Sequence, residues 1–339
     1  MKKIAVTGGL GYIGSHTVVE LQNEGFEVVI IDDLSNSEIA VLAGIEKITG
    51  KKPAFETIDV CDTEKLRACF KKHSHIDAVI HFAAYKAVGE SVAKALEYYR
   101  NNVCGLISLL TVMREFECAN IVFSSSCTVY GQPDVLPVTE LSPIKKAESP
   151  YGSTKQMSED IITDTVAAEK SLSAILLRYF NPIGAHPSAL IGELPKGVPN
   201  NLLPYITQTA AGLRTELHVF GNDYNTPDGS CIRDYIYVLD LAQAHVVALQ
   251  RMLGSKESGS LEIFNIGTGK GLSVLEILHE FMQANGVNVP YKIVGRRAGD
   301  IEQIWAETTR ANEVLGWRAH TPLNEVLQSA WKWEQKLRG

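Results

Sequence analysis

Apolar stretches and helix-like patterns alternate along the first half of the chain. Short apolar stretches rich in β-branched residues lie at 3–8, 27–32, 54–60, 78–83, 120–126 and 173–180. Between them, apolar residues recur at helical spacing, most clearly at 12–25, 63–73 and 91–116. Strands that alternate with helices imply right-handed crossovers and a parallel sheet covered on both faces. We therefore predict an α/β fold built on a doubly wound parallel sheet.

The pattern changes after Phe180. Residues 181–232 are rich in Pro, Gly and Asn, and the elements that follow are more scattered. We predict helices at 199–212, 273–286 and 322–337, and one further strand at 262–268. This change favours two domains: residues 1–180, and a smaller mixed α/β domain at 181–339. The second domain is expected to pack over the carboxyl edge of the sheet, with some of its segments returning to that sheet.

Composition and charge exclude several classes of protein. The chain of 339 residues has a formal net charge of -7, which argues against nucleic acid as a partner, and no polybasic run suggests a membrane surface. The start, MKKIAVTGGLGYIG, lacks the apolar run of a secretory signal, and no apolar stretch long enough to span a membrane follows. The six cysteines include no CxxC pair, and only His73 and His75 lie close together. We expect a cytoplasmic protein with reduced thiols and no metal site.

A glycine-rich turn follows the first predicted strand and opens the first predicted helix. Gly9, Gly11 and Gly14 satisfy G-x-G-x-x-G, and Gly8 takes the first place in the looser form G-x-x-G-x-x-G. Such a turn lets backbone amides approach a pyrophosphate at a helix N-terminus. Asp32 ends the second predicted strand, where a carboxylate accepts hydrogen bonds from a ribose diol and repels a 2′-phosphate. The combination predicts a Rossmann-type site for NAD rather than NADP.

Three residues near other predicted strand ends are further cofactor candidates. Asp59 ends the third predicted strand, where it either meets the adenine or caps the following turn. Lys86 follows the fourth strand, and it either neutralises a phosphate or is an ordinary surface lysine. Asn101 is polar within a long apolar helix, and it either bonds the strand-end loops or is a structural amide.

Tyr151 and Lys155 stand one helical turn apart, at the start of a helix that Pro150 introduces. A tyrosine phenol, with an ordinary pKa of about 10, is a poor base at neutral pH. Lowering that pKa to about 7 requires roughly 4 kcal/mol, which one positive charge about 4 Å away supplies at an effective dielectric constant of about 20. Burial opposes the shift. Lys155 and an oxidised nicotinamide would together supply two such charges, whereas an exposed i,i+4 pair without function is the alternative.

Ser124, Ser125 and Ser126 end the fifth predicted strand, at the edge where parallel sheets present ligands. A serine hydroxyl there relays a proton or binds a substrate oxygen, although three serines also suit an ordinary turn. Ser126, Tyr151 and Lys155, together with GGLGYIG, resemble the extended short-chain dehydrogenase/reductase superfamily. Within it, the segments HFAAYKAVGESV, SSSCTVYG, LRYFNPIGAHPS and FGNDYNTPDGSCIRDYIYVLDLA resemble the UDP-galactose 4-epimerase family, and the similarity runs from residue 3 to about residue 335.

The resemblance implies NAD-dependent interconversion of UDP-galactose and UDP-glucose through a 4-keto intermediate, with NAD tightly bound. Tyr151 would be the base, Lys155 would lower its pKa and hold the nicotinamide ribose, and Ser126 would assist at the sugar hydroxyl. The implied cofactor site consists of Gly8, Gly11, Tyr12, Ile13, Gly14, Asp32, Asp33, Asn36, Ser37, Asp59, Val60, Phe82, Ala83, Ala84, Lys86, Asn101, Ser126, Tyr151, Lys155 and Phe180.

The resemblance also implies a UDP-hexose site. Its residues would be Ser126, Tyr151, Tyr179, Asn181, Asn201, Leu217, His218, Phe220, Arg233, Arg297 and Asp300. Arg233 and Arg297 are suitable cations for a diphosphate in an otherwise acidic protein. Phe220 would flank the uracil, and Tyr179 and Phe180 would wall the nicotinamide.

Several alternatives remain open at this point. A nucleotide-sugar 4,6-dehydratase needs an acid and a base just after Ser126, and Cys127 and Thr128 stand there, which disfavours it. Some family members carry a large tyrosine where this chain has Ile304, so activity on UDP-GlcNAc and UDP-GalNAc is open. A cofactor-sensing protein would keep the glycine turn without needing the catalytic residues. Finally, family members pair the helices at 91–116 and 153–170 between subunits, which implies a homodimer; burial within the monomer is the alternative.

Overall fold

The central sheet of the protein is parallel throughout the part of the chain that the structure describes. A computed structural model describes residues 1–255, 258–297 and 299–339. Within these residues the sheet has seven strands in the order β10-β6-β5-β4-β1-β2-β3, and every neighbouring pair is parallel. The strands are β1 (Lys3–Thr7), β2 (Glu27–Asp32), β3 (Ala54–Thr57), β4 (Ala78–His81), β5 (Asn120–Ser126), β6 (Ser173–Tyr179) and β10 (Leu261–Ile266). The predicted doubly wound α/β fold is confirmed.

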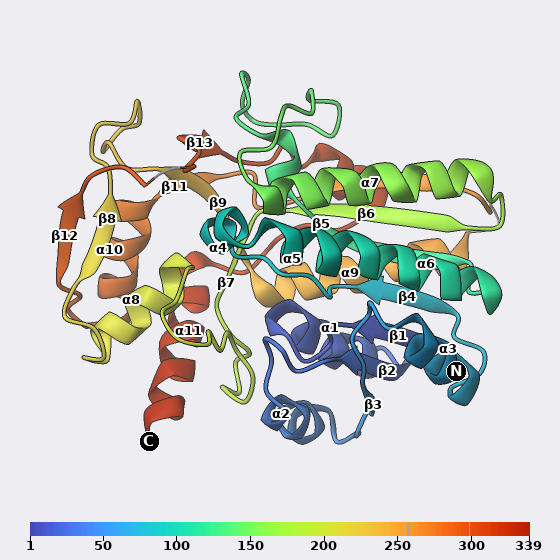
Figure 1. Ribbon diagram of the computed structural model, residues 1–339. Helices are drawn as coiled ribbons and strands as arrows, with labels where there is room; N and C mark the ends of the chain where they lie inside the picture. Colours follow the sequence, from blue (N-terminus) through green and yellow to red (C-terminus); the bar gives the residue numbers. More distant parts are fainter. Residues whose placement is uncertain (256–257, 298) are drawn as a thin grey trace.

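Helices cover both faces of this sheet (Figure 1). One core packs the sheet against α1 (Tyr12–Asn23), α2 (Ala40–Thr49) and α9 (Val238–Gly254). The other packs it against α3 (Thr63–Lys72), α6 (Gly105–Glu115) and α7 (Pro150–Ala168). Since both faces are buried, the strands read as nearly continuous apolar runs, which is why the sequence pattern located them.

The strand order reverses between β1 and β4. From β1 the chain proceeds to β2 and β3 on one side, and it then crosses to β4, β5 and β6 on the other side. Open parallel sheets bind ligands in the crevice beyond the carboxyl ends of the strands at such a switch point. The fold therefore predicts a ligand site beyond the carboxyl ends of β1 and β4.

The later elements form a second group beside the carboxyl edge of the sheet, at the left of Figure 1. A four-stranded sheet joins β7 (Asn181–Ile183), β9 (Ile232–Tyr237), β11 (Gly271–Ser273) and β13 (Gln303–Ile304), and β8 (Leu217–Phe220) pairs with β12 (Tyr291–Val294). These strands pack with α8 (Leu202–Ala210), α10 (Val274–Asn285) and α11 (Leu323–Arg338). No helix among the described residues is both long enough and apolar enough to cross a membrane.

Several elements differ from the sequence prediction, and two of these differences concern long helical regions. The long helix expected at 91–116 is divided into α4 (Val88–Ala93), α5 (Ala95–Tyr99), a π-helical segment at Arg100–Cys104 and α6. In the π-helical segment, Asn102 is buried and bonds Tyr85, so the wider turn serves to place an inward-pointing amide. In addition, α9 is a long helix that the sequence pattern did not reveal.

Candidate active site

The glycine turn holds the start of α1 close to the ends of two strands. Gly8 has φ +68°, and a Cβ atom on it would lie 2.8 Å from the backbone nitrogen of Ala83, which follows β4. A Cβ on Gly14 would lie 2.2 Å from the oxygen of Gly8. Any larger residue at these two positions would displace the backbone. The tight turn therefore leaves the N-terminus of α1 directed to the switch point, as a diphosphate site requires.

Asp32 closes β2 beside this turn. Its side chain is buried and accepts hydrogen bonds from the backbone nitrogens of Leu10 and Leu34, both at 3.0 Å, and from Ser37 Oγ at 2.7 Å. These three donors fix the carboxylate in one orientation. It lines the cavity described next, where a ribose diol would find an acceptor.

A cavity of about 680 Å³ occupies the switch point, a size suited to a cofactor or small ligand. Most of the predicted cofactor residues line it, as do several predicted substrate or catalytic residues. The predicted residues in its wall are Gly8, Gly11, Tyr12, Ile13, Gly14, Asp32, Asp33, Asn36, Ser37, Val60, Phe82, Ala83, Ala84, Lys86, Asn101, Tyr151, Lys155, Tyr179 and Asn201. The structure thus brings together residues that are far apart in the sequence.

Other cofactor candidates lie outside the wall of this cavity. Asp59 is exposed and accepts a hydrogen bond from the backbone nitrogen of Cys61 at 2.8 Å, because β3 already ends at Thr57. Phe180 is buried among apolar residues that include Cys127 and Ile304. The bond to the strand-end loop that was considered for Asn101 is made by its neighbour: Asn102 accepts from the backbone nitrogen of Tyr85 at 2.8 Å and donates to its oxygen at 3.0 Å.

Tyr151 and Lys155 lie on the first turns of α7. Ser149 caps this helix by accepting a hydrogen bond from Gly152, and Pro150 is its first residue. Both side chains are buried and both line the cavity. Lys155 Nζ donates to the backbone oxygen of Ser124 at 2.7 Å and lies 6.0 Å from the centroid of the Tyr151 ring. The end of β5 therefore fixes the ammonium group beside the phenol.

Burial controls the acid–base properties of this pair. It raises the pKa of Tyr151 well above 10, while interaction with the Ser126 hydroxyl lowers that pKa. Burial also lowers the pKa of Lys155 to about 8, and the nearby Glu159 carboxylate raises it. The pKa of Tyr151 therefore stays above its ordinary value although Lys155 lies nearby, and a further positive charge beside the phenol would lower it.

Ser126, at the end of β5, does not line the cavity, and the other remaining substrate candidates lie among the C-terminal elements, where three of them are in contact. Arg297 Nη2 donates to Asp300 Oδ1 at 2.6 Å, and its guanidinium lies 5.4 Å from the centre of the Phe220 ring. Arg233, on β9, stands opposite Ile304 in the register of β13. Asn181 begins β7 and pairs with Tyr235 of β9.

The two candidates at the start of β8 point in opposite directions. Leu217 is buried in the core of the C-terminal group, whereas His218 is exposed and lies 3.2 Å from Glu216. Side chains alternate between the faces of a strand, so only one of these two side chains faces any given ligand.

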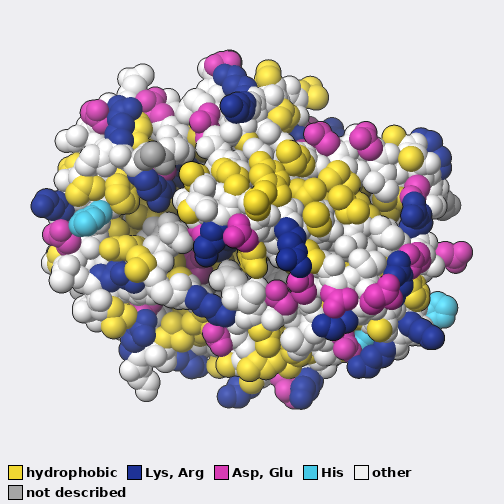
Figure 2. All heavy atoms as spheres, viewed as in Figure 1, with side chains coloured by type: hydrophobic (Ala, Val, Ile, Leu, Met, Phe, Trp, Pro, Cys, Tyr) yellow, Lys and Arg dark blue, Asp and Glu magenta, His cyan; other side chains and the backbone are white. Residues whose placement is uncertain are grey.

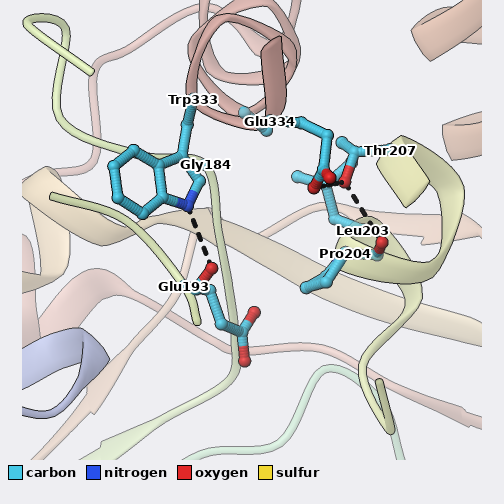
Figure 3. Close-up of a pocket in the computed structure, with 8 residues that line it drawn as sticks. Gly184, Glu193, Leu203, Pro204, Thr207, Trp333 and Glu334 are labelled. Atoms are coloured by element: carbon cyan, nitrogen blue, oxygen red, sulfur yellow. Dashed lines mark hydrogen bonds between the residues drawn. The ribbon is translucent and has the colours of Figure 1, made fainter. Parts of the chain in front are cut away.

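The sequence reasoning missed a segment of the cavity wall, at 192–200. Glu193 Oε1 lies 2.9 Å from Lys86 Nζ and accepts from Asn201 Nδ2 at 2.6 Å. Lys196 donates to the backbone oxygens of Leu34 and Ser35 across the cavity, each at 3.0 Å. The indole of Trp333 on α11 anchors the segment by donating to the backbone oxygen of Glu193 at 3.0 Å (Figure 3). In the sequence, the only local sign of this segment was its content of Pro and Gly.

The fold and the site define the class of protein. A doubly wound parallel sheet, a glycine turn at the switch point, a strand-end aspartate and a buried tyrosine–lysine pair on one helix are the marks of a dinucleotide-dependent enzyme of the extended short-chain dehydrogenase/reductase type.

Comparisons with known proteins agree and are more specific. The family model described as GDP-mannose 4,6 dehydratase matches residues 5–330. A UDP-glucose 4-epimerase of Yersinia enterocolitica is 50% identical over 332 residues, which cover 98% of this chain and 97% of the relative. The chain belongs to the UDP-glucose 4-epimerase family.

Solved structures support the same assignment. The UDP-glucose-4-epimerase of Stenotrophomonas maltophila, solved with bound NAD and formylated UDP-arabinopyranose, has a TM-score of 0.96 and 47% identity, covering 100% of this chain and 99% of that chain. The Bifidobacterium longum enzyme, solved in complex with NAD+ and UDP, has a TM-score of 0.95 and 44% identity, covering 99% and 98%.

Proposed function

We propose that this protein interconverts UDP-galactose and UDP-glucose by NAD-dependent epimerisation at C4 of the hexose, through a 4-keto intermediate. The observation that carries the proposal is the placement of Tyr151 and Lys155 in the wall of the cavity that the glycine turn and Asp32 also line. A dinucleotide site and an acid–base pair in one cavity are what reversible oxidation of a sugar alcohol requires. The relatives that are named UDP-glucose 4-epimerase support the choice of sugar.

The cavity fits NAD. A Cβ on Gly8 or Gly14 would collide with backbone, so only glycine allows the tight turn that places the start of α1 for a diphosphate, and the fixed Asp32 carboxylate suits a ribose diol. NAD, when bound, supplies the hydride acceptor and donor for C4 and a positive charge in its oxidised form. Gly8, Gly11, Tyr12, Ile13, Gly14, Asp32, Ser37, Phe82 and Lys86 are the residues that we assign most directly to holding it.

The protein residues handle the proton and the orientation of the sugar. Tyr151 takes the proton from the C4 hydroxyl and later returns it. Lys155, held by the backbone oxygen of Ser124, keeps a positive charge beside the phenol, and Ser126, whose hydroxyl interacts with that phenol, binds the reacting sugar oxygen. If the uridine diphosphate is held firmly and the hexose loosely, the keto sugar can turn over and present its other face.

We assign the nucleotide end of the substrate to the C-terminal group at 181–339, and the dinucleotide to residues 1–180 with β10 added to their sheet. Arg233 and Arg297 are suitable partners for the diphosphate, and Phe220 for the uracil. Arg297 is paired with Asp300 and lies against Phe220, so these three side chains form one preassembled surface. Asn201 is the N-cap residue just before α8, and its side-chain amide donates to Glu193 in the cavity wall.

A 4,6-dehydratase is disfavoured, although the matching family model carries that description. Removal of water from C5 and C6 requires a second acid–base pair near the sugar. Cys127 and Thr128, which follow Ser126 on a short 3₁₀ turn, are a buried thiol and a hydroxyl. Burial raises the pKa of the Cys127 thiol to about 12, so it is not a base at neutral pH.

Activity on N-acetylated sugars is a second candidate. Ile304 is buried, stands opposite Arg233 in the strand register, and packs in the same apolar cluster as Cys127. This position therefore adjoins the proposed sugar end of the site. An isoleucine there leaves more space than a tyrosine would.

We also propose that two copies of the chain form a dimer through the faces of α4 to α7. Val92, Leu96, Ile107 and Met157 on these helices are 67, 81, 46 and 43% exposed, although they are apolar. Figure 2 shows hydrophobic side chains gathered over α5 and α7. Apolar area of this kind is typical of interaction surfaces. Leu96→Glu should convert the dimer to a monomer in analytical ultracentrifugation, and an unchanged mass would refute this interface.

The cysteines agree with a reducing compartment such as the cytoplasm. All six are free, and four of them, at 69, 118, 127 and 231, are buried. We propose the cytoplasm as the place of action on this basis.

The function is tested by mixing purified protein with UDP-galactose, without added NAD, and separating the products. UDP-glucose should accumulate towards an equilibrium mixture. UDP-GlcNAc and a guanosine diphosphate hexose serve as comparison substrates. Conversion of one of these, with none of UDP-galactose, would refute the choice of substrate.

A further inference from the structure

Glu159 is a buried charge beside the catalytic pair that the proposed chemistry leaves unused. It lies on α7, one turn after Lys155 and two turns after Tyr151, and its side chain is only 9% exposed. Its carboxylate accepts from Ser125 Oγ at 2.5 Å and from Arg178 Nη2 at 2.6 Å. Arg178 is itself buried, on β6. Buried ion pairs are costly to form and contribute little net stability, so stability alone does not account for this pair.

Glu159 takes part in one of three contacts that join the end of β5 to α7. Three consecutive serines at the end of β5 each meet a different residue of the helix. The backbone oxygen of Ser124 accepts from Lys155, the hydroxyl of Ser125 donates to Glu159, and the hydroxyl of Ser126 interacts with the phenol of Tyr151. The strand end and the catalytic face of the helix are thereby held in one register.

Arg178 connects these contacts between β5 and α7 to the neighbouring strands β6 and β10. It is the register partner of Ser125 in the pairing of β5 with β6. Its Nη1 donates to Tyr130 Oη at 3.1 Å, and Tyr130 Oη donates to Asn265 Oδ1 of β10 at 2.6 Å. The Glu159 carboxylate is therefore fixed by the strand that also bears Tyr179, a residue of the cavity wall.

We propose that Glu159 is a positioning residue for the catalytic tyrosine–lysine pair: through Ser125 it sets the end of β5 against α7, and its carboxylate places a negative charge one helical turn from the Lys155 ammonium. This inference rests on the proposed function, because it concerns the same site.

The charged and titratable groups around Lys155 support the electrostatic part. Lys155 faces Tyr151 and Glu159 on its own helix, the Phe123 ring of β5 at 4.8 Å, and His81 at the end of β4. Burial, with a smaller contribution from Lys155, lowers the pKa of His81 to about 3, so this imidazole is neutral at neutral pH. Glu159 in turn faces Arg178, behind which lies Tyr130. Glu159 is thus the negative group that opposes the effect of burial on Lys155, whose pKa is about 8.

A second carboxylate with similar partners, away from the cavity wall, provides a matched control. Glu334 on α11 accepts from Thr207 Oγ1 at 3.0 Å, as Figure 3 shows, and from Arg338 Nη2 at 2.6 Å. It is also buried. Ser125→Ala and Thr207→Val therefore each remove one hydroxyl bond to a buried, arginine-paired carboxylate, but only the first touches β5.

The experiment compares these two variants with Glu159→Gln and the unchanged protein, using UDP-galactose as substrate. Ser125→Ala should lower kcat about tenfold or more at unchanged KM and NAD content, since small misplacements of catalytic groups have effects of this size. Thr207→Val should keep kcat. Glu159→Gln should move the fall of kcat on the basic side to lower pH by about one unit, because loss of the negative charge lowers the pKa of Lys155.

The outcomes test the role of Glu159 and the proposed function separately. A Ser125→Ala variant with unchanged kcat, or with the same loss as Thr207→Val, overturns the inference, as does a Glu159→Gln variant with an unchanged basic limb. If Glu159→Gln fails to fold, the comparison of Ser125→Ala with Thr207→Val decides alone. If the unchanged protein does not convert UDP-galactose at all, it is the proposed function that fails.

Discussion

The Lys155 ammonium lies 6.0 Å from the centre of the Tyr151 ring and donates its hydrogen bond to the backbone of Ser124. The ammonium is thus oriented by the strand. The phenol oxygen is therefore available to a substrate hydroxyl. The Ser126 hydroxyl, which interacts with the phenol, can pass a proton between them. The relationship explains why the two residues need a spacing of four on a helix whose N-terminus meets the end of β5.

Replacement of the phenol tests its role as the base. Tyr151→Phe should lower kcat by about a thousandfold, within the range expected for loss of general acid–base catalysis. Bound NAD should be retained, because the change removes one oxygen from the cavity wall. Tyr205→Phe, on α8 outside that wall, is the matched control and should keep full activity. Substantial activity in Tyr151→Phe would show that another group takes the proton.

The ion pair between Lys86 and Glu193 predicts a specific pattern of cofactor affinity. Lys86→Met leaves the Glu193 carboxylate without its cation beside the proposed diphosphate site. NAD affinity should fall at least about tenfold, since unpaired like charges at short distance repel strongly. Adding Glu193→Gln to Lys86→Met should restore part of that loss. Equilibrium dialysis with NAD measures all three proteins, and a double variant as weak as the single one would show that Glu193 does not face the ligand.

Three buried histidines predict a marked loss of stability in mild acid. Burial lowers the pKa values of His16 and His81 to about 3 and that of His245 to about 4, compared with an ordinary value of 6.5. The folded state binds fewer protons than the unfolded state between these values. The contribution of these neutral histidines to the free energy of unfolding is therefore fully present above pH 6.5, and it decreases as the pH falls below 6.5. Each histidine should cost about 2 kcal/mol of unfolding free energy between pH 7 and pH 5.

Urea unfolding at the two pH values measures this loss. His245→Gln removes one titrating group from α9 and should reduce the difference between pH 7 and pH 5 by about 2 kcal/mol. An unchanged difference would mean that His245 is already protonated in the folded protein at pH 5.

Ile304 predicts which sugars are accepted. Because it adjoins Arg233 and Cys127, a larger side chain there should occupy space near the hexose. Ile304→Tyr should reduce turnover of UDP-GlcNAc relative to UDP-galactose by about tenfold or more, a few kcal/mol being typical of one steric clash in a pocket. Ile304→Val is the control and should leave the ratio of the two activities unchanged. A ratio unchanged by tyrosine would place the N-acetyl group elsewhere.

The sequence located the central sheet well because its strands are buried on both faces. The runs at 27–32 and 120–126 coincide with β2 and β5. By contrast, α9 was missed because buried residues lie on most of its sides, Asp240, Leu241, Ala244 and Val246 among them, so no single apolar stripe marks it. The long helix at 91–116 was predicted without its break, since the inward turn of Asn102 depends on Tyr85, from another element.

The candidate site shows the same division between local and distant information. Gly8, Asp32, Tyr151 and Lys155 were predicted because each occupies a fixed spacing relative to a strand end or helix start. Glu193 was not predicted, because its partner Lys86 is 107 residues away and only the folded chain brings them together. Glu159 gave no signal for a related reason: its meaning depends on Ser125 and Arg178, which lie on two other elements.

The most direct test of the central claim follows the hydrogen atom at C4. The protein is incubated, without added NAD, with UDP-galactose that carries deuterium at C4, and the UDP-glucose formed is analysed by mass spectrometry and NMR. Return of the same hydride predicts UDP-glucose that retains the deuterium at C4 and gains no hydrogen from water there. Loss of the deuterium to solvent, or no conversion by a protein that contains NAD, would contradict the account.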